Sequence, residues 1–140
     1  MKHQHSPHAF IIPVRVYYED TDAAGVVYYA NYLRYFERCR TEWMRAIGHG
    51  QADFNRDEGL GFVVRRVSVD YQKPARLDDA LTVGLEVEKL GRAQVVVRQF
   101  VLRGDEELVT GTVQIVCVDL QKLKSAAIPE HLLTKLKALQ

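Results

Sequence analysis

The sequence predicts an α+β fold in which a curled antiparallel sheet wraps around one long helix. Three observations predict it: a long amphipathic helix pattern ends at Gly48, alternating β-type stretches begin near residue 62, and short turns join the last of them as in hairpins. The 140 residues match the usual size of one domain. We therefore expect residues 1–140 to form a single domain, with residues 1–8 as a frayed or disordered N-terminus.

The helix pattern occupies the second half of residues 19–48. Apolar side chains recur there at steps of three and four residues, whereas Arg and Glu lie mostly on the other side. Gly48 is typical of a helix end. Capping preferences favour a start at Asn31, but the site interpretation given below needs free backbone N–H groups near Tyr29, so we expect the earlier start. The apolar side comprises Leu33, Phe36, Cys39, Trp43 and Ile47, and the aromatic row Tyr32, Phe36, Trp43 is assigned to the core rather than to a ligand pocket.

Strand patterns precede and follow this helix. Pro13 interrupts the backbone donors of the first one, which suits an edge strand. Residues 49–61 indicate a short helical or irregular connector, Gly104-Asp105 a hairpin turn, and Pro129 the start of a short closing helix. A sheet that covers only one helix leaves edges unpaired, so we expect a homodimer or a dimer of dimers, which is a homotetramer. The expected strands cover residues 9–18, 62–72, 81–88, 93–102 and 108–120.

Composition excludes several classes of protein. The net charge is +1 with both signs interspersed, so no basic stripe for nucleic acid is present. Cys39 and Cys117 lie in apolar stretches and are expected to be core thiols, and no apolar run suits a membrane span or an export signal, so we expect a cytoplasmic protein. His3, His5 and His8 could bind metal adventitiously, but nothing near them fixes their geometry. We expect no metal and no cofactor.

An acidic turn and a loop of small residues precede the helix, within residues 19–25. Asp22 lies a few residues before the first helical turn, whose free N–H groups carry the positive end of the helix dipole. Gly25 allows backbone to approach a ligand closely. Considered without further information, Asp22 could equally be an aspartate that only interacts with the dipole. Glu19 and Asp20 are expected to be solvated or to hydrogen-bond the loop, or to tune Asp22 through like charge.

The chain resembles hotdog-fold acyl-CoA thioesterases of the 4-hydroxybenzoyl-CoA thioesterase family, and within it the bacterial subgroup encoded beside the Tol–Pal envelope system. The resemblance rests on the block YYEDTDAAGVVYYANYLRYFERCRTEWMR, with FVVRRVSVDYQKPARLDDALTV and GTVQIVCVD further along. In that family the second aspartate of the motif, here Asp22, is the catalytic carboxylate, and the N–H at the position of Tyr29 contacts the thioester oxygen. The subgroup commonly has histidine at that position, whereas hydroxybenzoyl-CoA enzymes can have tyrosine. Tyrosine in place of histidine keeps the backbone N–H donor but removes any contribution of an imidazole.

The resemblance implies a thioesterase that releases free acid and CoA. Asp22 would attack the carbonyl to form a mixed anhydride or would deprotonate a water, and both routes stay open. Acyl length, aromatic or aliphatic character, and CoA or acyl carrier protein as the carrier stay open too. The alternative is a non-catalytic hotdog module that binds acyl-CoA or acyl carrier protein near the Tol–Pal system; a hydratase is disfavoured because no Asp/His pair is apparent. Expected substrate contacts, with basic residues for the CoA phosphates, are Gly25, Val27, Tyr28, Asn31, Arg65, Arg66, Lys73 and Arg76.

Overall fold

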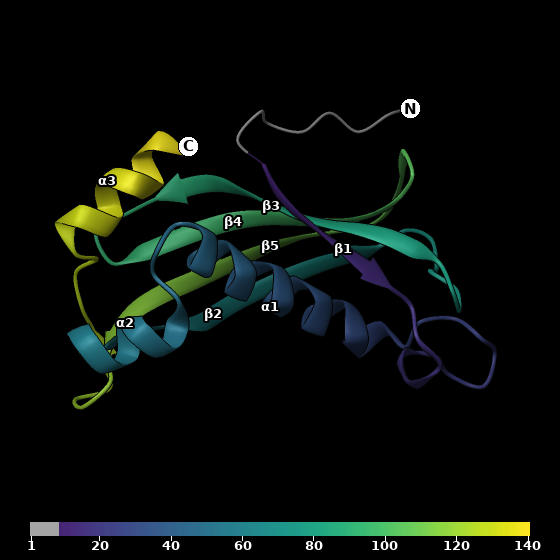
Figure 1. Cartoon of the computed structure of the whole chain (residues 1–140), viewed down its shortest axis with the longest axis horizontal. Helices are drawn as coiled ribbons and strands as arrows, with labels where there is room; N and C mark the ends of the chain where they lie inside the picture. Colours follow the sequence, from purple (N-terminus) through teal and green to yellow (C-terminus); the bar gives the residue numbers. More distant parts are fainter. Residues whose placement is uncertain (1–8) are drawn as a thin grey trace.

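A curled antiparallel sheet with one long helix on its concave face forms the body of the protein (Figure 1). The computed structural model describes residues 9–140, so the expected frayed terminus and its three histidines lie outside the described residues. The strands follow the order β1-β3-β4-β5-β2, and the short β6 pairs with β5. Their bounds are β1 Phe10–Arg15, β2 Leu60–Tyr71, β3 Ala80–Leu90, β4 Gln94–Arg103, β5 Glu106–Asp119 and β6 Lys124–Ser125.

The sheet has the predicted arrangement. β3, β4 and β5 form successive antiparallel hairpins, and Gly104 takes a positive φ of 62° in the turn between the last two. β1, which contains Pro13, pairs only with β3 and is an edge strand. β2 is the other edge and pairs with β5 through a register shift between Val64 and Arg66. Sequence analysis did not predict β6, because two residues are too few to show the alternation of apolar and polar residues that marks a strand.

Helix α1 spans Tyr29–Ala46, so the earlier of the two possible starts is confirmed. Gly48, with a φ of 85°, takes the left-handed conformation that ends a helix. The buried side is centred on Tyr32, Phe36 and Trp43, so this aromatic row is part of the core, although Tyr32 also lines a pocket. Leu33 is 39% exposed, so its assignment to the core was wrong: it follows Tyr32 by about 100° around the helix. The buried residues of α1 are Asn31, Tyr32, Tyr35, Phe36, Cys39, Trp43 and Met44.

The helix approaches the sheet closely because small residues leave room for aromatic rings. A Cβ added to Gly111 on β5 would lie 2.8 Å from Cε2 of Phe36 and 3.0 Å from the Ser68 carbonyl oxygen. A glycine at this position therefore lets α1 lie against the sheet with a full phenyl ring between them. Both Cys39 and Cys117 are buried and free, as expected for core thiols.

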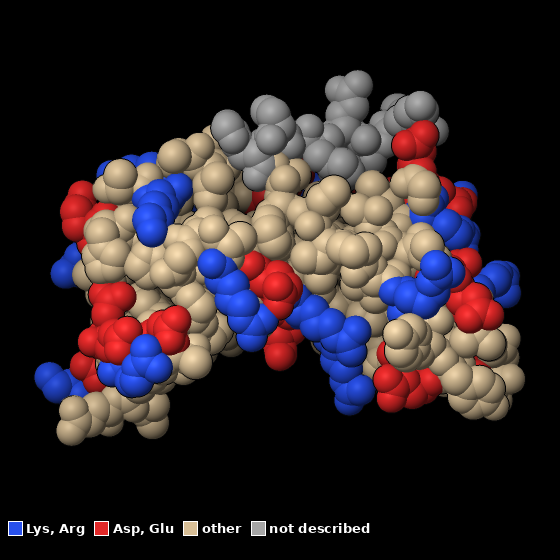
Figure 2. Space-filling view, in the orientation of Figure 1, with Lys and Arg blue, Asp and Glu red and all other residues tan. Residues whose placement is uncertain are grey.

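Two short helices cover the end of the molecule at which α1 terminates (Figure 1). α2 spans Gln51–Glu58 and buries Phe54, which confirms a short helical connector. α3 spans Glu130–Ala138, directly after Pro129, and buries Leu132 and Leu136. Figure 2 shows Lys and Arg beside Asp and Glu across the face in view, without a continuous area of one sign. Among the residues from 9 onward, no helix is both long and apolar enough to cross a membrane.

Candidate active site

Asp22 lies at an exposed turn between a short 3₁₀ helix, Tyr18–Asp20, and the start of α1. Its Oδ1 accepts the N–H of Ala24 at 2.8 Å, and its backbone oxygen accepts the N–H of Gly25 at 3.0 Å. Gly25 has a φ of 78°, and a Cβ added there would meet nothing within 4 Å. The glycine is therefore needed for its backbone conformation rather than for space, and the turn leaves the carboxylate facing solvent.

The segment after β2 fixes this loop from the side. Val27 is 5% exposed and donates its N–H to the Ala75 oxygen at 2.9 Å, while Leu77 donates to the Gly25 oxygen at 3.2 Å. The buried hydroxyl of Tyr32 accepts the N–H of Ala75 at 3.0 Å, and burial raises the pKa of this tyrosine. Hydrogen bonds to Ala75 thus connect the Asp22 loop and the start of α1 to the segment that follows β2. Val27 supports the loop from within and does not present a polar group to a ligand.

Asp20 is buried and holds the acidic turn against α1. Its Oδ2 accepts the Tyr17 N–H at 2.8 Å, and its Oδ1 accepts the side-chain amide of Asn31 at 3.2 Å. The same amide reaches the Asp20 backbone oxygen at 3.2 Å. Burial, and to a lesser extent the Asp20 carboxylate, raises the pKa of Tyr35. Asn31 was expected to contact substrate; in the structure its side chain is buried and its amide donates to the Asp20 carboxylate and backbone oxygen.

The first turn of α1 offers two backbone donors. Tyr28 donates its N–H to the Asp20 oxygen at 2.9 Å, and Asn31 donates to the Tyr28 oxygen at 2.8 Å. Tyr28 precedes the helix without a side-chain cap. No acceptor within residues 9–140 takes the N–H of Tyr29 or Ala30. The sequence interpretation needs free N–H groups near Tyr29; the Tyr28 amide is occupied, whereas the Tyr29 amide is open.

An aromatic pocket adjoins these donors. The rings of Tyr29 and Tyr71 lie edge to face with centroids 6.2 Å apart, and Tyr32 lies 5.6 Å from Tyr71. Tyr28 stacks at a tilt against Tyr29 at 4.8 Å, and both are exposed. The pocket has a volume of about 240 Å³ and is lined by Val27, Tyr29, Tyr32, Tyr71, Gln72, Lys73 and Pro74. Its walls are mostly aromatic and apolar, and Gln72 and Lys73 are the polar members.

Other hollows lie elsewhere among residues 9–140, and Asp22 lines neither of the two described next nor the aromatic pocket. One, of about 530 Å³, lies between β1 and α1 and is lined by Arg15, Asp20 and Arg38 among others. A third of about 260 Å³ lies between α1 and β2 near Arg40. Pocket volume alone therefore does not identify the candidate active site. The free amides of α1 and the Asp22 carboxylate point to the smaller aromatic pocket.

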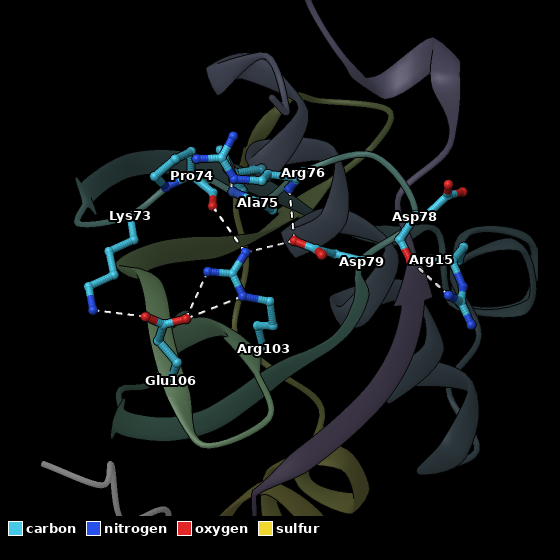
Figure 3. A network of polar contacts seen from close by, with 10 residues as sticks. Arg15, Lys73, Pro74, Ala75, Arg76, Asp78, Asp79, Arg103 and Glu106 are labelled. Atoms are coloured by element: carbon cyan, nitrogen blue, oxygen red, sulfur yellow. Dashed lines mark hydrogen bonds and ion pairs between the residues drawn. The ribbon is translucent and has the colours of Figure 1, made fainter. Parts of the chain in front are cut away.

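The expected phosphate contacts fall into two groups. Lys73 and Arg76 follow β2, next to the loop, and Lys73 pairs with Glu106 at 2.8 Å. Figure 3 shows Arg103 between Glu106 and Asp79, with contacts of 2.8 Å to each. Arg65 and Arg66 lie on the middle of β2, roughly 17–20 Å from Tyr71 of the aromatic pocket at the usual strand rise. The structure thus brings Lys73 and Arg76 to the site and places the other pair away from it.

The roles of three residues in the candidate site were not predicted from the sequence. Arg103 lies on β4, far along the chain, and orders the segment that carries Arg76 through Asp79. Tyr71 lies at the end of β2, where its alternation suggests an ordinary strand residue. Asp20 looks like any acidic turn residue. Only the pairing of segments distant in the sequence shows that these side chains build one site.

Comparison with known proteins gives consistent matches over most of the chain. A model of the thioesterase-like superfamily matches residues 16–136. The acyl-CoA thioesterase YbgC of Haemophilus influenzae is 45% identical over 122 residues, covering 87% of this chain and 90% of the relative. The acyl-CoA thioester hydrolase YbgC of Escherichia coli O6:H1 is 41% identical over 126 residues, covering 89% and 93%. A probable thioesterase from Bartonella henselae has a TM-score of 0.81 at 34% identity, covering 86% of this chain and 99% of that structure.

Proposed function

The chain belongs to the thioesterase-like superfamily, with the hotdog fold that the sequence predicts, and from this premise we propose that it hydrolyses acyl-CoA thioesters to free acid and CoA. One observation carries the proposal. The exposed Asp22 carboxylate stands on the loop that leads directly to the unoccupied amides of Tyr29 and Ala30. A nucleophile or base and donors for the developing negative charge are the two things that thioester hydrolysis requires.

The proposed chemistry uses these groups in sequence. The thioester oxygen accepts hydrogen bonds from the N–H groups of Tyr29 and Ala30, so the charge that forms on it in the tetrahedral intermediate meets the positive end of α1. Asp22 either attacks the carbonyl carbon, expelling the CoA thiolate and leaving an anhydride for water to open, or takes a proton from the attacking water. One preorganised donor of this kind contributes about 10²- to 10³-fold in rate.

The acyl group fits the aromatic pocket beside these amides. Tyr29 and Tyr71 present ring faces and edges at its mouth, and Lys73 and Arg76 lie where the phosphates of CoA can reach them. Arg65 and Arg66 remain proposed phosphate contacts for the more distant part of CoA. An acyl carrier protein, whose thioester is chemically the same, remains a second carrier. The two buried free thiols support a cytoplasmic location as part of the proposal.

We also propose that the active form is a homodimer built on β2, or a tetramer made of two such dimers. This edge strand is twelve residues long, and it pairs with β5 on one side only. Val63, Val64 and Val67 on it are 41–49% exposed. A second copy along this edge would cover them and would lie beside Tyr71, closing the aromatic pocket. Light scattering should show a dimer or tetramer, and Val67→Lys should shift it towards monomer with loss of turnover.

The direct test is turnover by Asp22→Asn. Free thiol release would be measured on acetyl-, butyryl-, palmitoyl- and 4-hydroxybenzoyl-CoA. Because Asp22 is exposed, the variant should fold normally and lose kcat by about 10²- to 10⁴-fold on the best substrate. Glu19→Gln removes a neighbouring exposed carboxylate of the same turn and should keep full activity. Equal rates for Asp22→Asn and the wild type would reject catalysis by this residue.

The second candidate is a binding module without turnover. It is favoured by one observation: the Asp22 carboxylate lines none of the described pockets and accepts an N–H within its own loop. Such a module, holding acyl-CoA or acyl carrier protein near the Tol–Pal system, would bind a non-hydrolysable acyl-CoA analogue equally well with Asp22→Asn and would show no thiol release with any substrate. Turnover that depends on Asp22 would exclude it.

A further inference from the structure

Three metal-ligand side chains from three separate segments meet at the end of the molecule away from the Asp22 loop. His49 follows α1, Glu58 is the last residue of α2, and His131 lies in the first turn of α3. One ligand atom from each lies within 4.8 Å of the others. Figure 1 shows α2 and α3 together at this end. The proposed thioester chemistry uses none of the three.

The distances are close to those that a metal would impose. Nε2 of His131 lies 3.4 Å from Oε1 of Glu58, and Nδ1 of His49 lies 3.9 Å from Oε2 of the same carboxylate. Zinc bonds of about 2.0–2.2 Å place neighbouring ligands of a tetrahedron about 3.3–3.6 Å apart. One pair already matches, and small rotations of the exposed Glu58 and His131 side chains would bring the rest into range.

His49 is the fixed member of the group. It is 7% exposed, its ring meets Phe54 edge to face at 6.1 Å, and the His131 ring lies 5.0 Å away. The buried ring thus has Nδ1 on the side of Glu58, 3.9 Å from its Oε2.

We propose that His49, Glu58 and His131 form a Zn²⁺ site that links α3 to the junction of α1 and α2. Two imidazoles and one carboxylate are a donor set that zinc accepts readily. Three protein ligands leave the fourth position to water, so the site would bind the metal more weakly than a closed site of four ligands. Its effect is to tie the C-terminal helix to the rest of the protein.

Lys135 gives the proposal a distinctive consequence. Its Nζ lies 3.5 Å from Nε2 of His49 and donates to the Ile47 oxygen at 2.9 Å. A positive charge this close repels a bound cation. Replacing it by a neutral side chain, Lys135→Gln, should therefore tighten Zn²⁺ binding several-fold, although Lys135 is not a ligand.

The experiment titrates Zn²⁺ into the full chain after removal of metal with a chelator. Because His3, His5 and His8 could bind zinc themselves, all variants carry His3→Ala, His5→Ala and His8→Ala. We expect one Zn²⁺ per chain, a higher Tm on zinc addition, and affinity at least about tenfold weaker for Glu58→Gln or His131→Ala.

The matched control is Asp57→Asn on the same turn of α2. Asp57 carries the same charge as Glu58 but pairs with Arg56 at 2.9 Å, so its loss should leave zinc affinity unchanged. Absence of stoichiometric binding in the triple-alanine background would overturn the proposal. So would wild-type affinity in Glu58→Gln, which decides the question even if His131→Ala does not fold. Thioesterase activity is measured separately, and its absence would not affect this test.

Discussion

Replacing Asp20 by asparagine tests how the loop is positioned. The carboxylate accepts two hydrogen bonds, from the Tyr17 N–H and the Asn31 amide, at a position only 7% exposed. An asparagine amide supplies one acceptor and one donor, so one of these two buried donors must face another donor. A lost hydrogen bond to a charged group costs about 1.5–3 kcal/mol, and we expect the free energy of unfolding to fall by that amount.

The same change should lower kcat. Asp20 also accepts the Tyr28 N–H through its backbone oxygen, next to the proposed Tyr29 donor. A loosened turn would move Asp22 relative to that donor, and displacements near 1 Å can cost roughly 10²-fold in rate. Urea denaturation and thiol-release kinetics measure the two effects, with the exposed Glu19→Gln as control, expected within about 0.5 kcal/mol of wild type. If Asp20→Asn unfolds at the wild-type midpoint with wild-type kcat, the buried contacts of Asp20 do not position the site.

Three further predictions concern the core and the His49 region. Gly84→Ala would place a Cβ 2.1 Å from Cζ of Phe100, so we expect urea denaturation to show a free energy of unfolding lower by about 1–3 kcal/mol, partly restored by adding Phe100→Leu. Wild-type stability of Gly84→Ala would contradict this close packing of Phe100 on Gly84. Burial raises the pKa of the Cys39 thiol to about 12 and of the Cys117 thiol to about 11, so Ellman's reagent at pH 8 should label both only in denaturant, and rapid labelling of the folded protein would be inconsistent with this. The pKa of His49 is lower in the folded protein than in the unfolded chain, so with chelator present the free energy of unfolding should decrease as the pH falls below about 6.5 and level off below the folded pKa. His49→Gln should reduce this dependence of the free energy of unfolding on pH. The same pH dependence in both proteins would contradict a contribution from His49.

The fold could be predicted because its main signals are local and periodic. The alternation of β3 and the three- and four-residue steps of α1 each follow from which side of an element is buried. Leu33 shows the limit of such reasoning. It fits the apolar period of the helix, but the sheet covers a sector centred on its neighbour Tyr32. The curl of the sheet decides which residues at the edge of this sector are covered. The sequence of the helix alone carries no information about that curl.

The site was predictable only in part, for a different reason. The motif located Asp22, Gly25 and the start of α1, because these belong to one continuous segment. The roles of Arg103 and Tyr71 depend on strand pairing across the sheet, so no spacing within the chain could reveal them. The zinc ligands are a similar case, because they come from three segments that meet only in the folded chain.

The two aspartates of the acidic turn lie in different local structures. Asp20 is the last residue of the short 3₁₀ helix, whereas Asp22 follows the extended Thr21 and begins the turn that contains Gly25. Asp20 is buried and its carboxylate accepts hydrogen bonds from the Tyr17 N–H and the Asn31 amide. Asp22 is exposed and accepts one N–H from its own loop. The carboxylate that builds the turn and the one proposed to react differ in environment, so Asp20→Asn should lower both stability and turnover, whereas Asp22→Asn should lower turnover alone.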